Sequence, residues 1–107
     1  MQFRVFELYG FKKRLRKLLS QQELQAYERF KKELKRGNLF GKPLSFRFLR
    51  EQKIGVKRIY FLVYYEIRII LFVDSSDKKA QKETVNKLKE LLPEFKNLAY
   101  KLSRKKK

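Results

Sequence analysis

The chain has 107 residues, with 29 Lys and Arg against 11 Asp and Glu, and its formal net charge is +18. It contains no Cys and no His, which excludes a disulfide framework, a thiol nucleophile and any acid–base chemistry that depends on imidazole. A hydrophobic fraction of 43% and an aromatic fraction of 15% exclude a disordered basic tail, so the composition indicates one small folded domain.

The first half of the chain predicts a strand followed by two helices. Residues 2–7 alternate in side-chain character, which is typical of a short strand. Apolar residues then recur at helical spacing over residues 11–19. Ser20 and Glu23 have the form of a capping box, so we expect a second helix to begin there and to end at a glycine cap formed by Gly37.

The second half predicts three consecutive strands and then a helix. The predicted strands cover residues 44–51, 56–64 and 67–73. Residues 52–55 are expected to form the loop between the first two strands, and Tyr65 and Glu66 the tight connection between the second and the third. Apolar residues at helical spacing follow from Val85, and we expect Pro93 to kink or split that helix because its ring removes a backbone donor.

This order of elements predicts an α+β fold. We expect a small antiparallel sheet of four strands, formed by the meander and the N-terminal strand, with the N-terminal helix pair on one face and a C-terminal helix. The predicted domain spans residues 1–102, and residues 103–107 are expected to form a basic tail.

The charge of the chain predicts a polyanionic partner. Solubility alone requires a net charge of about 2–8 in a domain of this size, so a charge of +18 favours binding to nucleic acid or to an acidic protein. The longest apolar stretch, residues 59–73, is interrupted by Glu66 and Arg68 and is too short to cross a bilayer as a helix. We therefore expect a cytoplasmic protein that does not bind a membrane.

Basic residues gather on and beside the predicted strands, whereas the sequence has no motif for a metal, a nucleotide or another cofactor. These basic residues are Arg47, Arg50, Lys57, Arg58, Arg68, Lys78, Lys79 and Lys82. A basic residue on an apolar strand indicates either an ion pair with an acid such as Glu51 or Glu66, or a contact with an anionic ligand. We expect Arg50, Arg58 and Lys79 to converge on one concave face.

Four short motifs resemble those of a known family. They are GKPL at 41–44, FLRE at 48–51, VKRIYFLVY at 56–64 and ILFVDSSDKK at 70–79. Together they resemble the RelE/ParE superfamily, which comprises toxins of bacterial and archaeal type II toxin–antitoxin pairs. The segment KAQKE at 79–83 is similar to the HigB-type branch of that superfamily.

The resemblance implies a toxin that enters the ribosomal A site, cuts mRNA as a metal-independent endoribonuclease and is blocked by an acidic antitoxin protein. By position, Arg58 matches the arginine of the central strand, Arg50 the basic position of the preceding strand, and Lys79 the last basic group. We therefore predict that Arg58, Arg50 and Lys79 are catalytic. The predicted RNA-binding residues are Arg47, Lys57, Lys78 and Lys82.

Cleavage by this chain requires a base that is not histidine. Crowding by other cations disfavours the charged form of a lysine, so the cluster of Lys78, Lys79 and Lys82 beside Arg58 is the candidate base. Two other functions fit the same sequence: a ParE-like toxin that binds DNA gyrase, and a non-catalytic basic module that binds nucleic acid. The basic set favours the nuclease, because a gyrase binder does not need it.

Overall fold

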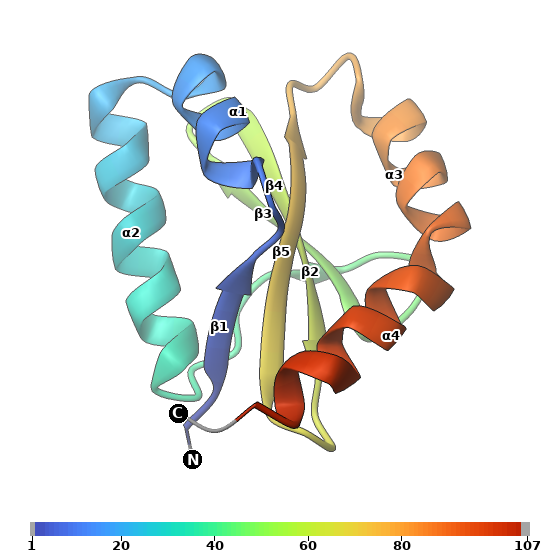
Figure 1. Ribbon diagram of the computed structural model, residues 1–107. Coiled ribbons are helices and arrows are strands. Elements are labelled where there is room, and N and C mark those ends of the chain that lie inside the picture. The colour runs from blue at the N-terminus through green and yellow to red at the C-terminus, as the bar shows by residue number, and fades with distance from the viewer. Residues whose placement is uncertain (1, 106–107) are drawn as a thin grey trace.

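The computed structural model describes residues 2–105 and has a five-stranded sheet between two pairs of helices (Figure 1). The strands are β1 (Arg4–Glu7), β2 (Lys42–Pro43), β3 (Leu49–Ile54), β4 (Lys57–Tyr64) and β5 (Ile69–Ser76). The helices are α1 (Phe11–Leu18), α2 (Gln21–Lys35), α3 (Gln81–Glu90) and α4 (Leu92–Ser103). The pair α1 and α2 covers one face of the sheet, and the pair α3 and α4 covers the other.

The strand order is β1-β5-β4-β3-β2, and all neighbours are antiparallel except β1, which runs parallel to β5. The α+β class and the antiparallel meander predicted from the sequence are confirmed. The sheet is mixed rather than wholly antiparallel, and it gains a fifth strand, the two-residue β2. Because β1 and β5 are separated by most of the chain, no tight turn imposes an antiparallel pairing on them.

The first strand of the meander is displaced from its predicted position. Residues 44–48 form a loop rather than a strand, and β3 continues through residues 52–54, where the sequence predicts a loop. Only Gly55 and Val56 remain between the paired ends of β3 and β4. Gly55 has a φ of 61°, which favours glycine, and a Cβ atom there would lie 2.4 Å from the Glu23 carboxylate.

The last strand begins and ends later than predicted. Arg68 has a φ of 52° and lies in the turn that joins β4 to β5, so its predicted place on the strand is wrong. The strand continues beyond Val73 because Ser75 and Ser76 pair with the first residues of β4. This extension brings the end of β5 alongside Arg58.

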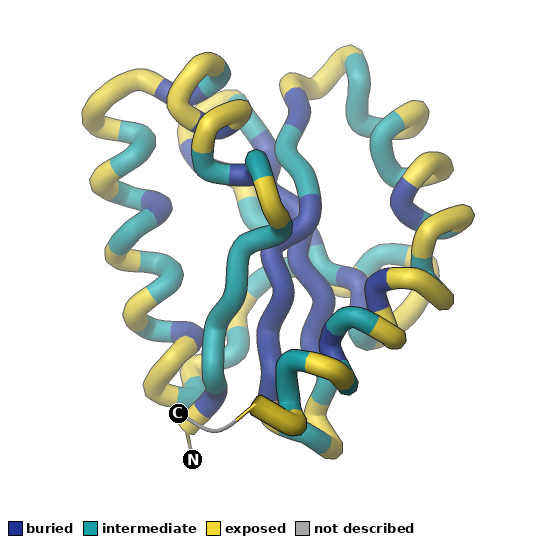
Figure 2. Tube along the Cα trace, in the orientation of Figure 1, coloured by how far each residue is buried: buried dark blue, intermediate teal, exposed yellow. Residues whose placement is uncertain are grey.

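Alternate residues of β4 build two separate cores, and the central strands are the most deeply buried part of the chain (Figure 2). Ile59, Phe61 and Val63 pack against the α1–α2 side and are at most 1% exposed. Tyr60 and Leu62 pack on the opposite side, against α3 and α4. A strand with helices on both faces is apolar on both faces, which explains the unbroken apolar run in the sequence.

Local signals in the sequence set the helix ends correctly. The hydroxyl of Ser20 accepts a hydrogen bond from the Glu23 N–H at 3.2 Å, and the Glu23 carboxylate accepts one from the Ser20 N–H at 2.8 Å. Pro93 lies in the first turn of α4 and divides the predicted C-terminal helix into α3 and α4. Helix α4 ends at Ser103, one residue beyond the predicted domain boundary, and residues 106–107 of the predicted tail lie outside the described residues.

Candidate nucleic-acid interface

Arg58 lies near the start of β4 and is buried on the face of the sheet that α3 and α4 cover. Because side chains alternate between the two faces along a strand, Arg58 lies on the same face as Tyr60 and Leu62, which belong to the core of that face. The Arg58 side chain is 9% exposed, and its Nε lies 3.5 Å from Oε2 of Glu51, whose side chain is 4% exposed. Arg58 therefore forms a buried ion pair with Glu51, one of the two acids that the sequence offered as partners.

Helix α3 holds the other oxygen of the same carboxylate. Gln81, the first residue of α3, donates a hydrogen bond from Nε2 to Oε1 of Glu51 at 2.5 Å. Glu51 and Arg58 come from neighbouring strands, whereas Gln81 lies 30 residues after Glu51 in the chain. Contact with the start of α3 limits the access of water to the ion pair, which strengthens the attraction between the two charges.

A second polar pair fixes the end of β5 beside Arg58. Ser76 is the register partner of Arg58, and its hydroxyl donates to the backbone carbonyl of Asp77 at 2.9 Å. Because Ser76 has a single hydroxyl proton, the Tyr60 hydroxyl is the donor in the 2.8 Å bond between the two side chains. Burial raises the pKa of Tyr60, so this hydroxyl keeps its proton at neutral pH.

The Arg58 guanidinium has donor capacity left over. Its Nε is buried and has no hydrogen-bond partner among residues 2–105. The 3.5 Å contact with Glu51 is an ion pair without the geometry of a hydrogen bond. A guanidinium carries five N–H donors in a planar fork that fits the oxygens of a carboxylate or a phosphate. Because Nε itself is closed to solvent, an anionic ligand would bind the terminal Nη groups of this fork.

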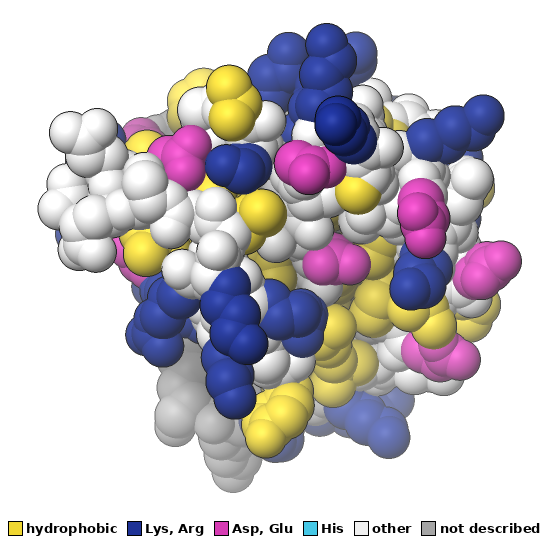
Figure 3. Space-filling model, turned by 90° about the horizontal axis from the view of Figure 1, so that it is seen from above, with side chains coloured by type: hydrophobic (Ala, Val, Ile, Leu, Met, Phe, Trp, Pro, Cys, Tyr) yellow, Lys and Arg dark blue, Asp and Glu magenta, His cyan; other side chains and the backbone are white. Residues whose placement is uncertain are grey.

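Further cations lie at the same end of the sheet, which we call the basic end. Its members are Lys53, Arg58, Lys78, Lys79 and Lys82. Lys78 and Lys79 lie in the connection from β5 to α3, Lys82 follows in α3, and all three are exposed. Seen from above, this end of the molecule presents many Lys and Arg side chains among fewer acids (Figure 3).

Lys53 is a member that the sequence prediction missed. It is exposed and pairs directly with Arg58 across β3 and β4, so the two side chains emerge on the same face. Lys53 lies within residues 52–55, which the sequence predicts to form a loop rather than a strand. The available signal was the alternation of Leu49, Glu51 and Lys53, which continues the strand by one more pair.

Arg50 and Lys57 lie on the opposite face from Arg58, so the expected convergence of Arg50 with Arg58 is wrong. Arg50 pairs in register with Phe61, which faces the α1–α2 side. Its Nη2 donates to the Tyr65 hydroxyl at 2.5 Å, and its Nη1 lies 3.5 Å from the backbone carbonyls of residues 39 and 40. Lys57 has the same orientation, since it alternates with Arg58 along β4.

Arg47 lies at the far end of the sheet from Arg58. It belongs to the loop of residues 44–48 and lines a groove against α4. The groove also contains Tyr64, six residues after Arg58 on β4, which is roughly 20 Å along a strand. The predicted residues are thus divided. Arg58, Lys78, Lys79 and Lys82 share the basic end, Lys57 lies at the same end of the sheet but on the opposite face, and Arg47 and Arg50 lie elsewhere.

Some cations on the helix pair are committed to ion pairs. Lys12 contacts Glu28 and lies 4.0 Å from Glu7, and Lys31 lies 3.1 Å from Glu28 and 3.2 Å from Glu7. The Tyr27 hydroxyl donates to Glu7 at 2.5 Å, and burial raises the pKa of Tyr27. These contacts hold α1 and α2 against β1, so Lys12, a basic residue of α1, has a structural role.

Between residues 2 and 105, no three potential metal-ligating side chains lie close enough to hold an ion. No helix in the same part of the chain is long and apolar enough to cross a membrane. Comparison with protein-family models finds no match, and comparison with curated proteins finds none either. The function of the protein must therefore be inferred from the chemistry of the basic end.

Proposed function

We propose that the protein is the toxin of a type II toxin–antitoxin pair, of the RelE/ParE kind, and that it inhibits translation in the cytoplasm by cutting mRNA on the ribosome. The observation that supports this most directly is the buried Arg58, whose Nε has no hydrogen-bond partner within residues 2–105. Glu51 supplies a counter-charge at 3.5 Å but no hydrogen bond to Nε, so the cost of burying the guanidinium is only partly compensated. The α+β order of the elements is compatible with this proposal.

In the proposed reaction, the 2′-hydroxyl of one nucleotide attacks the adjacent phosphorus. A bond forms between O2′ and phosphorus, and the bond from phosphorus to the 5′ oxygen of the next nucleotide breaks. A water molecule takes up the 2′ proton, and the departing 5′ oxygen takes up a proton from water. Negative charge accumulates on the non-bridging oxygens of the phosphate, where the Arg58 guanidinium stabilises it.

The neighbours of Arg58 have different roles in this proposal. Lys79, on the exposed connection before α3, adds a positive charge that helps to hold the RNA phosphate. Glu51 is a positioning residue, because its carboxylate is shared between Arg58 and Gln81. Alignment of the 2′-hydroxyl by the ribosome lowers the demand on the protein groups.

An acidic antitoxin is the protein partner in this proposal. A net charge of +18 attracts an acidic chain as strongly as it attracts RNA, and the two ligands compete for the same cations. Co-expression with an acidic protein encoded beside this one is expected to restore growth to cells that express the toxin.

Ribosome-dependent mRNA cleavage by Arg58 variants tests the proposal. We expect Arg58→Lys to lose cleavage, because an ammonium cannot reproduce the bidentate fork. The variant Lys87→Ala is the control, since Lys87 is exposed on the same helix as Lys82 and lies outside the basic end.

A double variant separates chemistry from stability. Arg58→Ala alone leaves the Glu51 carboxylate buried without its partner, so it can fail to fold. Glu51→Gln combined with Arg58→Gln removes both charges, and we expect this protein to fold and not to cut. Cleavage at the parental rate by the folded double variant would show that Arg58 is only a structural residue. A parent protein that never cuts on ribosomes would favour the gyrase-binding or the non-catalytic function.

A further inference from the structure

A large hollow lies at the end of the sheet opposite the basic end. It is a groove of about 630 Å³ between the loop of residues 44–48, the β4–β5 turn and helix α4. We call it the α4 groove. Neither the ion pair at Arg58 nor the proposed cleavage uses it, and Tyr64 and Leu92 of its lining belong to the same face of the sheet as Arg58.

Aromatic rings dominate the α4 groove. Four of its ten lining residues are aromatic, whereas aromatic residues make up 15% of the chain. Phe48 stacks on Phe46 with ring centres 5.3 Å apart and planes inclined by 21°. Phe46 is 43% exposed and Tyr65 is 44% exposed, so large flat surfaces remain uncovered in and beside the groove. A cluster of exposed rings on a folded domain marks a binding surface.

One polar group in the lining has no partner. The Tyr64 hydroxyl is buried and makes no hydrogen bond to any residue from 2 to 105. Burial raises the pKa of Tyr64 to about 12, so the hydroxyl is neutral and can both donate and accept. Because the hydroxyl is closed to solvent, the part of Tyr64 that the groove presents to a ligand is its ring.

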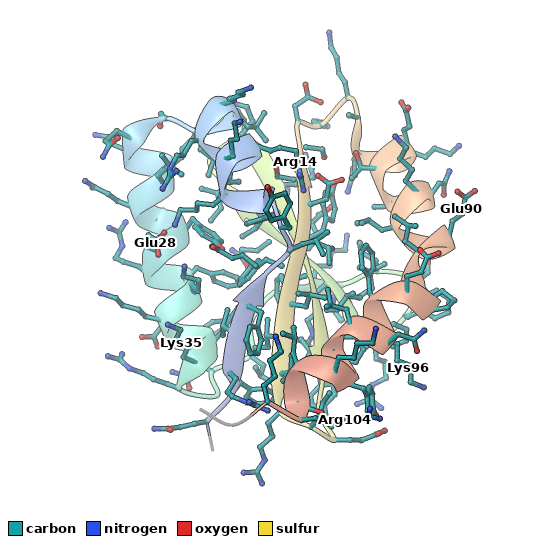
Figure 4. All side chains as sticks on the ribbon, in the orientation of Figure 1. Arg14, Glu28, Lys35, Glu90, Lys96 and Arg104 are labelled. Atoms are coloured by element: carbon teal, nitrogen blue, oxygen red, sulfur yellow. The ribbon has the colours of Figure 1, made fainter. Side chains whose placement is uncertain are left out.

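The charges around the groove are mainly positive. Arg47 lies in its loop wall and Lys96 on α4, where the Lys96 ammonium lies 6.0 Å from the centre of the Tyr100 ring (Figure 4). Glu66 is the acid of the lining, and its carboxylate accepts a hydrogen bond from the Tyr100 hydroxyl at 2.8 Å. The two cations therefore remain available to a ligand that combines a flat ring with a negative charge.

We propose that the α4 groove binds an unpaired base of a single-stranded RNA by stacking, with the adjacent phosphates on Arg47 and Lys96. Aromatic rings combined with cations are what single-stranded nucleic-acid sites use, because every base has a flat face beside a phosphate. A protein segment that docks through aliphatic side chains does not need this combination. The choice of RNA as the polyanion rests on the proposed function.

The separation of the two sites sets the length of RNA that spans them. Arg58 and Tyr64 are roughly 20 Å apart along β4. At about 3.4 Å per stacked nucleotide, an RNA strand bound at both sites needs at least roughly six nucleotides, because α3 and α4 cover the face between the sites and the strand must pass around them. A probe of about twelve nucleotides is therefore long enough to occupy the basic end and the α4 groove together.

Two probes with equal charge test the proposal by fluorescence anisotropy. One is a single-stranded 2′-O-methyl RNA of about twelve nucleotides, which attack by a 2′-hydroxyl cannot cleave. The other is an abasic strand with the same number of phosphates. We expect the parent protein to bind the strand with bases about tenfold more tightly than the abasic strand. Equal binding of the two probes would overturn the proposal.

Variants of Tyr65 and Lys96 separate stacking from charge. Tyr65→Ala is expected to abolish the tenfold preference and to leave binding of the abasic strand unchanged. Tyr65→Phe keeps the ring but removes the hydroxyl that accepts from Arg50, and we expect it to keep the preference. Lys96→Ala is expected to weaken the binding of both probes equally. Tyr9→Ala is the control, since Tyr9 is 98% exposed and does not line the groove.

A competing peptide distinguishes the other class of partner. If Tyr65→Ala weakens the binding of an acidic amphipathic peptide of Glu and Leu but leaves the preference for bases intact, the groove is a protein-docking site and the proposal is wrong. Ribosome-dependent cleavage is measured on the same proteins. A parent protein that cleaves normally but has no base preference refutes only the groove, whereas a parent protein that has the base preference but never cleaves refutes only the proposed function.

Discussion

Arg58 and Glu51 form a buried ion pair that also belongs to the proposed RNA site. Both side chains are almost fully buried, and the carboxylate is shared with Gln81. An ion pair at 3.5 Å without a hydrogen bond compensates only part of the cost of burying two charges. The arginine is therefore held in place by Glu51 but is not saturated by it.

Neutralising Glu51 is expected to destabilise the fold and to increase its dependence on anions. Glu51→Gln leaves the Arg58 guanidinium buried without a counter-charge, which costs about 3 kcal/mol in the free energy of unfolding. Urea unfolding measures the loss, and added polyphosphate is expected to recover more stability in this variant than in the parent.

Glu90→Gln is the matched control for that prediction, because it removes the same charge from an exposed position on α3. We expect it to unfold at the same urea concentration as the parent. If both variants are equally stable, the Glu51–Arg58 contact contributes nothing to the fold, and Arg58 is held by its packing alone.

Glu28 gives the helix pair a defined dependence on pH. Partial burial raises its pKa, but hydrogen bonds and attraction from Lys12 and Lys31 outweigh that effect, so the pKa of Glu28 is lowered from 4.5. At neutral pH the carboxylate is charged in both states, and its ion pairs stabilise the fold. Below pH 4.5 the unfolded chain binds the proton first, so this stabilisation is lost as the pH falls through the lower pKa of the folded state.

The variant Glu28→Gln is therefore expected to lower the free energy of unfolding at neutral pH but not in strong acid. Because the Glu28 side chain is 40% exposed, the loss at about pH 7 is expected to be under about 1 kcal/mol. Urea unfolding at about pH 7 and about pH 3 measures it, with Glu90→Gln as the control for net charge (Figure 4). An equal loss at both pH values would assign the effect to packing rather than to charge.

At the scale of the elements, α2 depends on the capping box at Ser20. We expect Ser20→Ala to cost about 1 kcal/mol, because it leaves an N–H of the first turn without its acceptor. Ser45→Ala is the control, since Ser45 is exposed in a loop. Chemical denaturation of the two variants compares them, and equal midpoints would mean that water replaces the cap without loss.

Signals that act within one helix were predictable, whereas the face of a strand was not. The capping box at Ser20 and the break at Pro93 depend on neighbouring residues, and both are found where the sequence predicts them. The relative faces of Arg50 and Arg58 depend on the length of the turn between two strands. Because the turn at Gly55 has two residues, even-numbered residues of β3 face the same side as odd-numbered residues of β4.

The α4 groove was not predictable for a similar reason. Its walls come from a loop, a turn and a helix that are distant in sequence, and residues 44–48 alternate in a way that is typical of a strand. In the structure Phe46 and Phe48 stack on each other with ring centres 5.3 Å apart, whereas alternate residues of a strand stand further apart. Which aromatic side chains remain exposed depends on which of them the core buries, and that is known only from the folded structure.

At the scale of the whole molecule, the charge of +18 sets how binding depends on salt. Each phosphate of a single strand that the protein neutralises contributes about 0.7 to the slope of log affinity against log salt. With about six phosphates neutralised, the affinity for RNA is expected to fall roughly 300-fold between about 50 and about 200 mM salt. Anisotropy titrations over that range measure the slope.

The slope of log affinity against log salt also distinguishes binding at the basic end from binding in the α4 groove, because stacking of a base releases no counterions. Lys79→Ala is expected to reduce the slope by about 0.7, whereas Tyr65→Ala is expected to weaken binding equally at every salt concentration and to keep the parental slope. Lys32→Ala is the charge-matched control, since Lys32 is exposed on α2, on the opposite side of the sheet from α3. If Lys32→Ala reduces the slope as much as Lys79→Ala does, RNA binds the charged surface as a whole, and the basic end has no special part in recognition.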